Sequence, residues 1–301
     1  MSVLIKDATV LDGSSPHAGK KIDLYIQQGK IAAIGKKLEV QPNKVIEGNQ
    51  LYVAPGWVDL VADYCEPGYE FKEVIDTGLN AAAAGGFTDV FLVPNTKPVI
   101  TNASILEFVQ KKGAGHKTKL HVLGAVSKNI EGKDLAEMMD MHHSGAIAFS
   151  DGWSPIQDAG LMLKALEYVK AFDGIIIQIP VQASLSKGGL MNESATSVKL
   201  GMSGIPAMSE SLMVYRDLEL LRYTGSRIHF SGITTAASVS LIKAAKMEGL
   251  RVSCSVTPYH LLYSDEMLQH YDSVYKVDPP LRAEVDRIAL IKALEDGSID
   301  C

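Results

Sequence analysis

The stretch SESLMVYRDLELLRYTGSRIHFSGITTAASVSLIKAAKMEGLRVSCSV, residues 209–256, decides the fold class of this 301-residue chain. Ser209–Tyr223 and Ala236–Met247 carry apolar residues at helical spacing, whereas 228–233 and 251–256 are short apolar runs of strand length. Helices and strands therefore alternate along the chain. This order predicts an α/β fold in which parallel strands are covered by helices.

The same alternation extends toward the N-terminus. Five further candidate strands precede the quoted stretch, separated by segments of helical length: 57–62, 88–93, 119–125, 145–149 and 174–179. Seven strands in strand-then-helix order favour a TIM-type (β/α) barrel over an open sheet. Such a barrel places its reactive groups at the C-terminal ends of its strands, so site residues are expected there.

The first fifty residues have a different pattern. They alternate and turn like short antiparallel strands, with Gln28-Gly29-Lys30 as a turn. We predict two units, a small β-sandwich-like unit over 1–52 and the barrel over 53–301. A barrel that starts near residue 52 and needs roughly 250 residues is just closing at the end of this sequence. We therefore expect a partial chain that lacks the last strand region of the barrel.

Composition excludes several classes of partner. The net charge is −6 and Lys and Arg are scattered, which argues against nucleic acid and anionic membranes as partners. Cys65, Cys254 and Cys301 lie too far apart for a Cys-rich zinc module, and three unclustered cysteines fit a reducing compartment. The chain has neither a secretory signal pattern nor a run of 18 apolar residues. We expect a cytoplasmic protein without a membrane span.

Six short phrases occur in order along the chain: 54–60 (APGWVDL), 66–68 (EPG), 94–98 (PNTKP), 204–206 (GIP), 257–261 (TPYHL) and 276–282 (KVDPPLR). Together they resemble the dihydroorotases, cyclic amidohydrolases of the amidohydrolase superfamily. The resemblance implies a metal-bearing TIM-type barrel with a small β domain. It also implies the reversible, zinc-dependent conversion of N-carbamoyl-L-aspartate into dihydroorotate, a step of pyrimidine synthesis. Zinc would supply the polarised water that this chemistry needs.

The resemblance assigns the zinc ligands to certain positions of this chain, and none of these positions holds a histidine. The His-x-His pair after the first barrel strand falls on Val61 and Asp63, and only one carboxylate of an adjacent Asp pair remains after the fourth strand. The full set of degenerate positions is Val61, Asp63, Asp151, Gly152, Ile179 and Gly232. The sequence also ends before the family's final catalytic Asp and its flanking His. No catalytic residue is therefore predicted.

Three positions correspond to residues that contact substrate in the family. Cys65 stands where the family has an Arg, and Asp278 stands where it has an Asn. Asn95 keeps the family residue, although in its proline-bracketed loop it can equally cap backbone groups of a turn. His229 lies three residues before the sixth-strand ligand position, so a structural role is expected. His260 is assigned to packing or to backbone hydrogen bonding.

A substitute metal site is not expected. Asp63 and Asp151 with Cys65 nearby would offer two carboxylates and a thiol, which form a poor ligand set for zinc without histidine. We therefore predict no metal cofactor, although the family uses zinc.

The strands and helices look undamaged although the chemistry is gone, which favours a retained non-catalytic role as a scaffold or regulatory subunit. The expected assembly is a homo-oligomer or a complex with aspartate carbamoyltransferase, a partner implied by the resemblance. The alternative is an active or weakly active dihydroorotase, or another cyclic amide hydrolase, with a site rebuilt around Asp63, Cys65, Asn95, Asp151 and Asp278. A third possibility is small-molecule binding without turnover.

Overall fold

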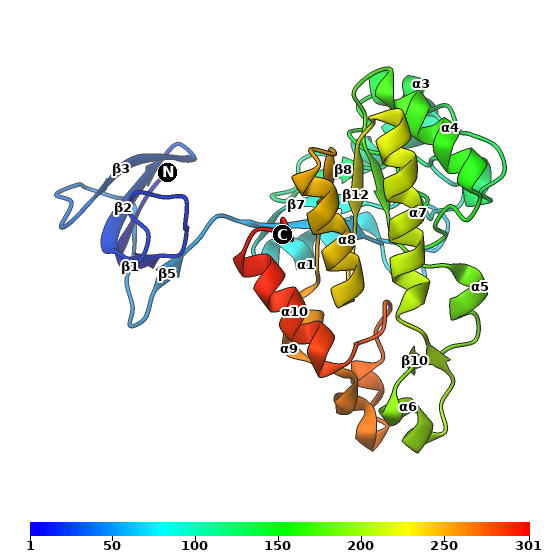
Figure 1. Cartoon of the computed structure of the whole chain (residues 1–301). Coiled ribbons are helices and arrows are strands. Elements are labelled where there is room, and N and C mark those ends of the chain that lie inside the picture. The colour runs from blue at the N-terminus through cyan, green and yellow to red at the C-terminus, as the bar shows by residue number, and fades with distance from the viewer. The chain divides into compact units, whose positions relative to one another are not determined.

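The computed structural model describes all 301 residues, and the chain divides into two compact units, Met1–Trp57 and Val58–Cys301. Each unit has a core of its own. The first unit is the blue part of the ribbon in Figure 1, and the second runs from cyan to red.

The first unit is one five-stranded sheet. Its strands are β1 (Ser2–Val10), β2 (Lys21–Gln27), β3 (Lys30–Gly35), β4 (Lys44–Ile46) and β5 (Tyr52–Val53). Strands β1, β2 and β3 pair antiparallel, but β4 and β5 run parallel to β1. The prediction of antiparallel strands was wrong for β4, which pairs with β1 in parallel, whereas β5 lies outside the first fifty residues to which that prediction applied. Alternate side chains of β1 and β2 form the core: Ala8, Val10, Ile22 and Leu24.

The strands of the second unit follow the predicted alternation. They form two three-stranded sheets, with orders β6-β7-β8 and β13-β12-β9. Their bounds are β6 (Trp57–Ala62), β7 (Phe87–Leu92), β8 (Lys119–Val122), β9 (Ile176–Gln178), β12 (Ile228–Phe230) and β13 (Val252–Cys254). The pairings of β7 with β8 and of β12 with β9 and β13 are parallel. Six of the seven expected strands are therefore present as named strands.

The seventh expected strand, 145–149, is reduced to a pair of bridges. Phe149 forms parallel bridges to Gly124 on one side and to Ile176 on the other, which joins the two sheets. At the far end, the backbone N–H of Asp300 donates to the carbonyl of Cys254 at 3.0 Å, and Val256 donates to the carbonyl of Cys301 at 2.9 Å. The last residues therefore lie beside β13 and continue the hydrogen-bond pattern of the sheet.

Helices cover the outside of the strands. The longer ones are α1 (Ile75–Ala84), α2 (Ala103–Lys112), α4 (Ala159–Lys170), α7 (Met208–Thr224), α8 (Ala236–Met247) and α10 (Glu284–Glu295). Helices α4, α7, α8 and α10 pack side by side in that order (Figure 1). Capping residues fix where helices begin: Asp158 accepts from the N–H of Leu161 at 2.7 Å, and Thr235 accepts from that of Ser238 at 3.2 Å.

Shorter elements fill the loops after the strands. They are α3 (Met138–His143), α5 (Ala183–Ser186), α6 (Ala195–Leu200), α9 (Pro258–Leu262), β10 (Met191–Asn192), β11 (Gly204–Ile205) and the 3₁₀ turns Lys128–Ile130, Asp265–His270 and Ser273–Tyr275. No helix is long and apolar enough to cross a membrane.

Two layers of apolar side chains hold the second unit together. The larger layer lies between strands and helices and includes Leu92, Val122 and Phe230. A smaller cluster contains Val93, Leu123, Ala148 and Ile177, with Val61 and Phe91 packed against it. Because neighbouring residues of a strand face opposite sides, this second cluster fills the inner face of the strands. The inside is packed with side chains, as is typical of a (β/α) barrel.

Candidate functional site

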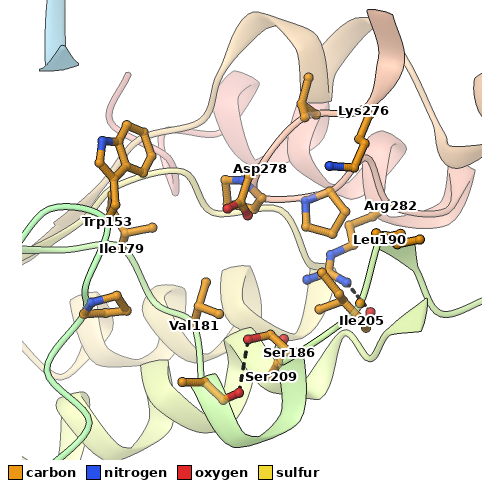
Figure 2. Close-up of a pocket in the computed structure, with 16 residues that line it drawn as sticks. Trp153, Ile179, Val181, Ser186, Leu190, Ile205, Ser209, Lys276, Asp278 and Arg282 are labelled. Atoms are coloured by element: carbon orange, nitrogen blue, oxygen red, sulfur yellow. Dashed lines mark hydrogen bonds between the residues drawn. The ribbon is translucent and has the colours of Figure 1, made fainter. Parts of the chain in front are cut away.

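A cavity of about 290 Å³ lies where the loops after the strands meet the segment 276–282 (Figure 2). Two of the positions predicted from the sequence, Ile179 and Asp278, line it. The other predicted positions do not line it: Val61, Asp63, Cys65, Asn95, Asp151, Gly152 and Gly232. The complete lining is Trp153, Pro155, Ile179, Val181, Ala183, Ser186, Gly189, Leu190, Ile205, Ser209, Lys276, Val277, Asp278, Pro279, Pro280 and Arg282.

The carboxylate of Asp151 is used inside the protein. It is buried and accepts hydrogen bonds from the backbone N–H groups of Val126 and Ser127, both at 2.9 Å, and from the hydroxyl of Ser127. Burial raises the pKa of this carboxyl above its usual value, while the hydrogen bonds act in the opposite direction. Both oxygens have partners, so this surviving carboxylate fixes the loop that follows β8.

Asn95 and Gly152 are in tight contact. The Asn95 side chain donates from Nδ2 to the carbonyl of Asp151 at 3.2 Å and accepts at Oδ1 from the N–H of Trp153 at 3.4 Å. Gly152 has φ +56°, and a Cβ built on it would lie 1.8 Å from Oδ1 of Asn95. Any side chain at position 152 would therefore collide with Asn95. In this structure Asn95 makes the backbone-capping contacts that a turn residue makes.

Asp63 and Cys65 form a local turn. Cys65 has φ +60°, and its N–H donates to Oδ1 of Asp63 at 2.9 Å. Burial, followed by the charge of Asp63, raises the pKa of the Cys65 thiol. The thiol is therefore protonated near neutral pH, which is the opposite of what a nucleophilic cysteine or a thiolate ligand requires.

The sixth-strand histidine is buried away from the cavity. His229 places Nδ1 2.8 Å from the hydroxyl oxygen of Ser253 and Nε2 3.1 Å from that of Ser255. Burial lowers the pKa of His229 to about 4, so the ring is neutral and both nitrogens have partners. The structural role predicted for His229 is confirmed. Gly232, three residues later, adopts φ +72°.

The residues present do not fit a zinc ion at the positions that the resemblance implies. Val61, Ile179 and Gly232 have no donor atom in their side chains, and Asp151 is bound to Ser127. Nowhere in the chain do three or more His, Cys, Asp or Glu side chains come together in an arrangement that could hold a metal ion.

Arg282 organises the base of the cavity, a role that sequence reasoning missed. Its Nε donates to the hydroxyl of Thr234 at 3.0 Å, and its Nη1 donates to Oδ1 of Asn192 at 3.0 Å and to the carbonyl of Ile205 at 2.9 Å. Asn192 in turn donates to Asp265 at 2.7 Å. The phrase 276–282 contains Arg282, but its partners lie 48 to 90 residues away in the sequence.

Two further buried groups hold the same region. The Glu210 carboxylate accepts from the backbone and hydroxyl groups of both Thr234 and Thr235. His260 donates from Nε2 to the carbonyl of Pro279 at 3.0 Å, while its Nδ1 accepts from the hydroxyl of Thr257 at 2.8 Å. The backbone role predicted for His260 is confirmed. These contacts fix the loop that carries Asp278.

Comparison with known proteins agrees with the phrases noted in the sequence. Residues 50–238 match the family model described as "Dihydro-orotase-like". A protein named dihydroorotase from Pelotomaculum thermopropionicum is 42% identical over 302 residues, which cover 100% of this chain and 70% of that protein. One from Streptomyces coelicolor is 41% identical over 97% of this chain and 69% of its own length.

Solved structures resemble the fold. An L-hydantoinase (dihydropyrimidinase) from Arthrobacter aurescens superimposes with a TM-score of 0.81 at 22% identity, over 99% of this chain and 67% of that one. A D-hydantoinase (dihydropyrimidinase) from Thermus sp. superimposes with a TM-score of 0.76 at 22% identity, over the same shares of the two chains. These likenesses concern the fold alone, and together with the alternation of strands and helices they confirm the predicted α/β class.

Proposed function

The chain belongs to the dihydroorotase-like family, and from this membership we propose that it is a non-catalytic member that serves as a scaffold or regulatory subunit. The observation that carries the proposal is the identity of Val61, Ile179 and Gly232. These residues occupy expected ligand positions and offer no side-chain atom that can bind a metal. A hydrolase of this family without a polarised water lacks its nucleophile.

The substrate positions support the same proposal. The family substrate is acidic, and an Arg at the position of Cys65 would pair with its carboxylate. Cys65 instead carries a protonated thiol beside Asp63. Asp278, in place of the family's Asn, adds a negative charge to the cavity wall. Both changes disfavour an acidic substrate.

A buried hydrogen-bond network lies beside the cavity. Glu210, Arg282 and His260 are buried and engaged in hydrogen bonds that span several loops. Such networks are costly to bury unless their groups are paired, so these pairings favour a single well-defined fold. We propose that this fold assembles as a homo-oligomer or with a pyrimidine-pathway enzyme such as aspartate carbamoyltransferase.

The alternative is an active dihydroorotase or another cyclic amide hydrolase. The observation in its favour is that relatives sharing 42% and 41% identity carry the name dihydroorotase. A rebuilt site would have to use Asp63, Cys65, Asn95, Asp151 and Asp278. Asp151 is already bound to Ser127, and Asn95 is bound to the backbone around Gly152.

The deciding experiment combines metal content with turnover. The protein is purified without chelator, its zinc is measured by elemental analysis, and dihydroorotate hydrolysis is assayed with and without added zinc. One of the curated relatives, prepared in parallel, is the positive control. We expect zinc far below one ion per chain and no turnover above the buffer rate, followed by capture of a partner in a pull-down with aspartate carbamoyltransferase. Stoichiometric zinc with turnover would contradict the proposal and favour the rebuilt site.

A further inference from the structure

Two buried polar side chains in the wall of the cavity each have an atom without a partner inside the protein. Ser209 is 1% exposed, and its hydroxyl makes no hydrogen bond. Arg282 is 4% exposed and uses Nε and Nη1, but its Nη2 has no hydrogen bond within the chain. Leaving a buried donor unpaired costs about 1–3 kcal/mol, and this cost applies to the Ser209 hydroxyl. Both residues line the same cavity, so both are available to a ligand that enters it.

A carboxylate without a hydrogen-bond partner lies on another wall. Asp278 lines the cavity and its side chain makes neither a hydrogen bond nor a close ion pair, although its charge acts on the Arg282 guanidinium and opposes the lowering of that group's pKa by burial. In Figure 2 it lies on one side of the cavity, while Val181 and Ser209 lie on the other. The exposed indole of Trp153 is part of the same lining, and an aromatic face of this kind attracts cations. Asp278 and this ring favour a positively charged nitrogen, although Lys276, which carries the same charge, also lines the cavity.

The rest of the lining is largely apolar. Ile179, Val181, Leu190 and Ile205 present aliphatic side chains between the two polar regions. The volume of about 290 Å³ lies just below the usual range of ligand pockets, roughly 300 to 1,000 Å³. The ligand is accordingly small, with an apolar body.

We propose that this cavity binds a free α-amino acid with an apolar side chain. Its carboxylate accepts from Nη2 of Arg282 and from the hydroxyl of Ser209, its ammonium group pairs with Asp278, and its side chain packs on Ile179 and Val181. An acid without an amine would leave the Asp278 carboxylate without a hydrogen-bond donor, and an amine without an acid would leave the Ser209 hydroxyl and Nη2 of Arg282 without an acceptor. The inference goes beyond the scaffold role and does not depend on it, since it concerns binding without turnover.

The test is isothermal titration of the full chain with L-leucine and with two analogues that each lack one group. The analogue without the amine is 4-methylpentanoate, and the analogue without the carboxylate is 3-methylbutylamine. We expect saturable binding of L-leucine that is at least tenfold tighter than that of either analogue, a difference of about 1.4 kcal/mol. We also expect a rise in Tm on saturation. Dihydroorotate and the neutral ureide dihydrouracil complete the panel.

Two variants locate the site. Asp278→Asn removes the carboxylate that pairs with the ammonium, and we expect it to weaken L-leucine at least tenfold while leaving 4-methylpentanoate equal or tighter. Ser209→Ala removes the unpaired hydroxyl and should weaken both carboxylates. Glu266→Gln is the matched control, because Glu266 is exposed, close in sequence and outside the lining.

Several results would overturn the inference. They are equal binding of L-leucine and either analogue, tighter binding of dihydroorotate or dihydrouracil, no saturation by L-leucine, or an unchanged affinity in Asp278→Asn. Turnover of dihydroorotate in the separate assay would contradict the scaffold role alone and would leave this inference standing.

Discussion

Asn95 occupies the space that a side chain at Gly152 would need: a Cβ on that glycine would lie 1.8 Å from Oδ1 of Asn95. The same Oδ1 accepts from the N–H of Trp153. The turn after the fourth strand position is therefore closed by an amide group at the point where the resemblance expects a metal ligand.

Gly152→Ala should destabilise the protein by about 2–4 kcal/mol, because it adds a collision with Asn95 to the strain of a positive φ. Urea denaturation measures the change. Gly201→Ala is the matched control, since Gly201 has φ +65° and nothing within 4 Å of its built Cβ. Gly201→Ala should lose only the free energy that a non-glycine residue needs to adopt a positive φ, about 1 kcal/mol. Equal losses in the two variants would mean that Asn95 yields without cost.

His229 should make stability depend on pH. Its pKa is lowered to about 4 in the folded protein, from 6.5 for a fully solvated histidine, so the unfolded chain binds more protons between these values. Its contribution is complete above pH 6.5 and is lost as pH falls toward 4, at most about 3 kcal/mol. His229→Gln should flatten the stability profile in this window relative to wild type, measured by urea denaturation at each pH.

Asp217 affects the pH dependence of stability in the opposite direction, because burial raises the pKa of its carboxyl to about 6. Wild type and His229→Gln both contain Asp217, so its contribution cancels when their stability profiles are subtracted. His270→Gln, at an exposed histidine, is the control and should leave the profile unchanged. If stability depended on pH in the same way in His229→Gln and in wild type, the protonation of His229 would not contribute to the pH dependence of folding.

Ser127→Ala should cost about 1–3 kcal/mol, because it removes the hydroxyl that the buried Asp151 carboxylate accepts from. The loss should be greater at pH 7 than at pH 4, since the charged carboxylate depends more on its donors. Chemical denaturation at the two pH values gives the comparison. Ser144→Ala removes a hydroxyl that bonds the exposed Glu107, and it should change stability by less than about 0.5 kcal/mol.

Cys65 should react slowly with iodoacetamide at pH 7.5, because burial and the charge of Asp63 raise the pKa of its thiol. Asp63→Asn removes that charge and should speed alkylation of the Cys65 peptide several-fold, as followed by mass spectrometry. Cys254 is buried and provides an internal reference that stays unmodified in both proteins. An unchanged rate in the variant would assign the slow reaction to burial alone.

The fold class followed from the sequence because alternation of strand and helix is a local property. The 228–233 run and the flanking helical segments appear as β12 between α7 and α8. The 145–149 strand was too short to form a full ladder, since Gly145 adopts φ +101° and only Phe149 bridges its neighbours. The parallel course of β4 also escaped prediction, because three residues of apolar alternation do not encode direction.

The site was predicted less completely. Positions such as Ile179 and Asp278 follow from the resemblance and line the cavity. The contact between Ser127 and Asp151 joins residues 24 apart, and that between Asn192 and Arg282 joins residues 90 apart. Such pairs leave no trace in local periodicity, because each partner is an ordinary loop residue until the strands bring them together.

The bridges at Phe149 bear on how the chain folds. Strands β6 to β8 come from one contiguous stretch of the sequence and β9, β12 and β13 from another, and the segment 148–150 joins the two sheets, with Phe149 bridged to Gly124 and to Ile176. Each half can form through pairings of modest sequence separation, and such pairings close small loops at low entropic cost. The relative register of the two halves then depends on the backbone hydrogen bonds of residues 148–150. Phe149 donates to the carbonyl of Ile175 and accepts from the N–H of Ile177, while Gly124 donates to Ala148 and accepts from Ser150. The segment around Phe149 is thus where the backbone pairing of the two halves becomes continuous.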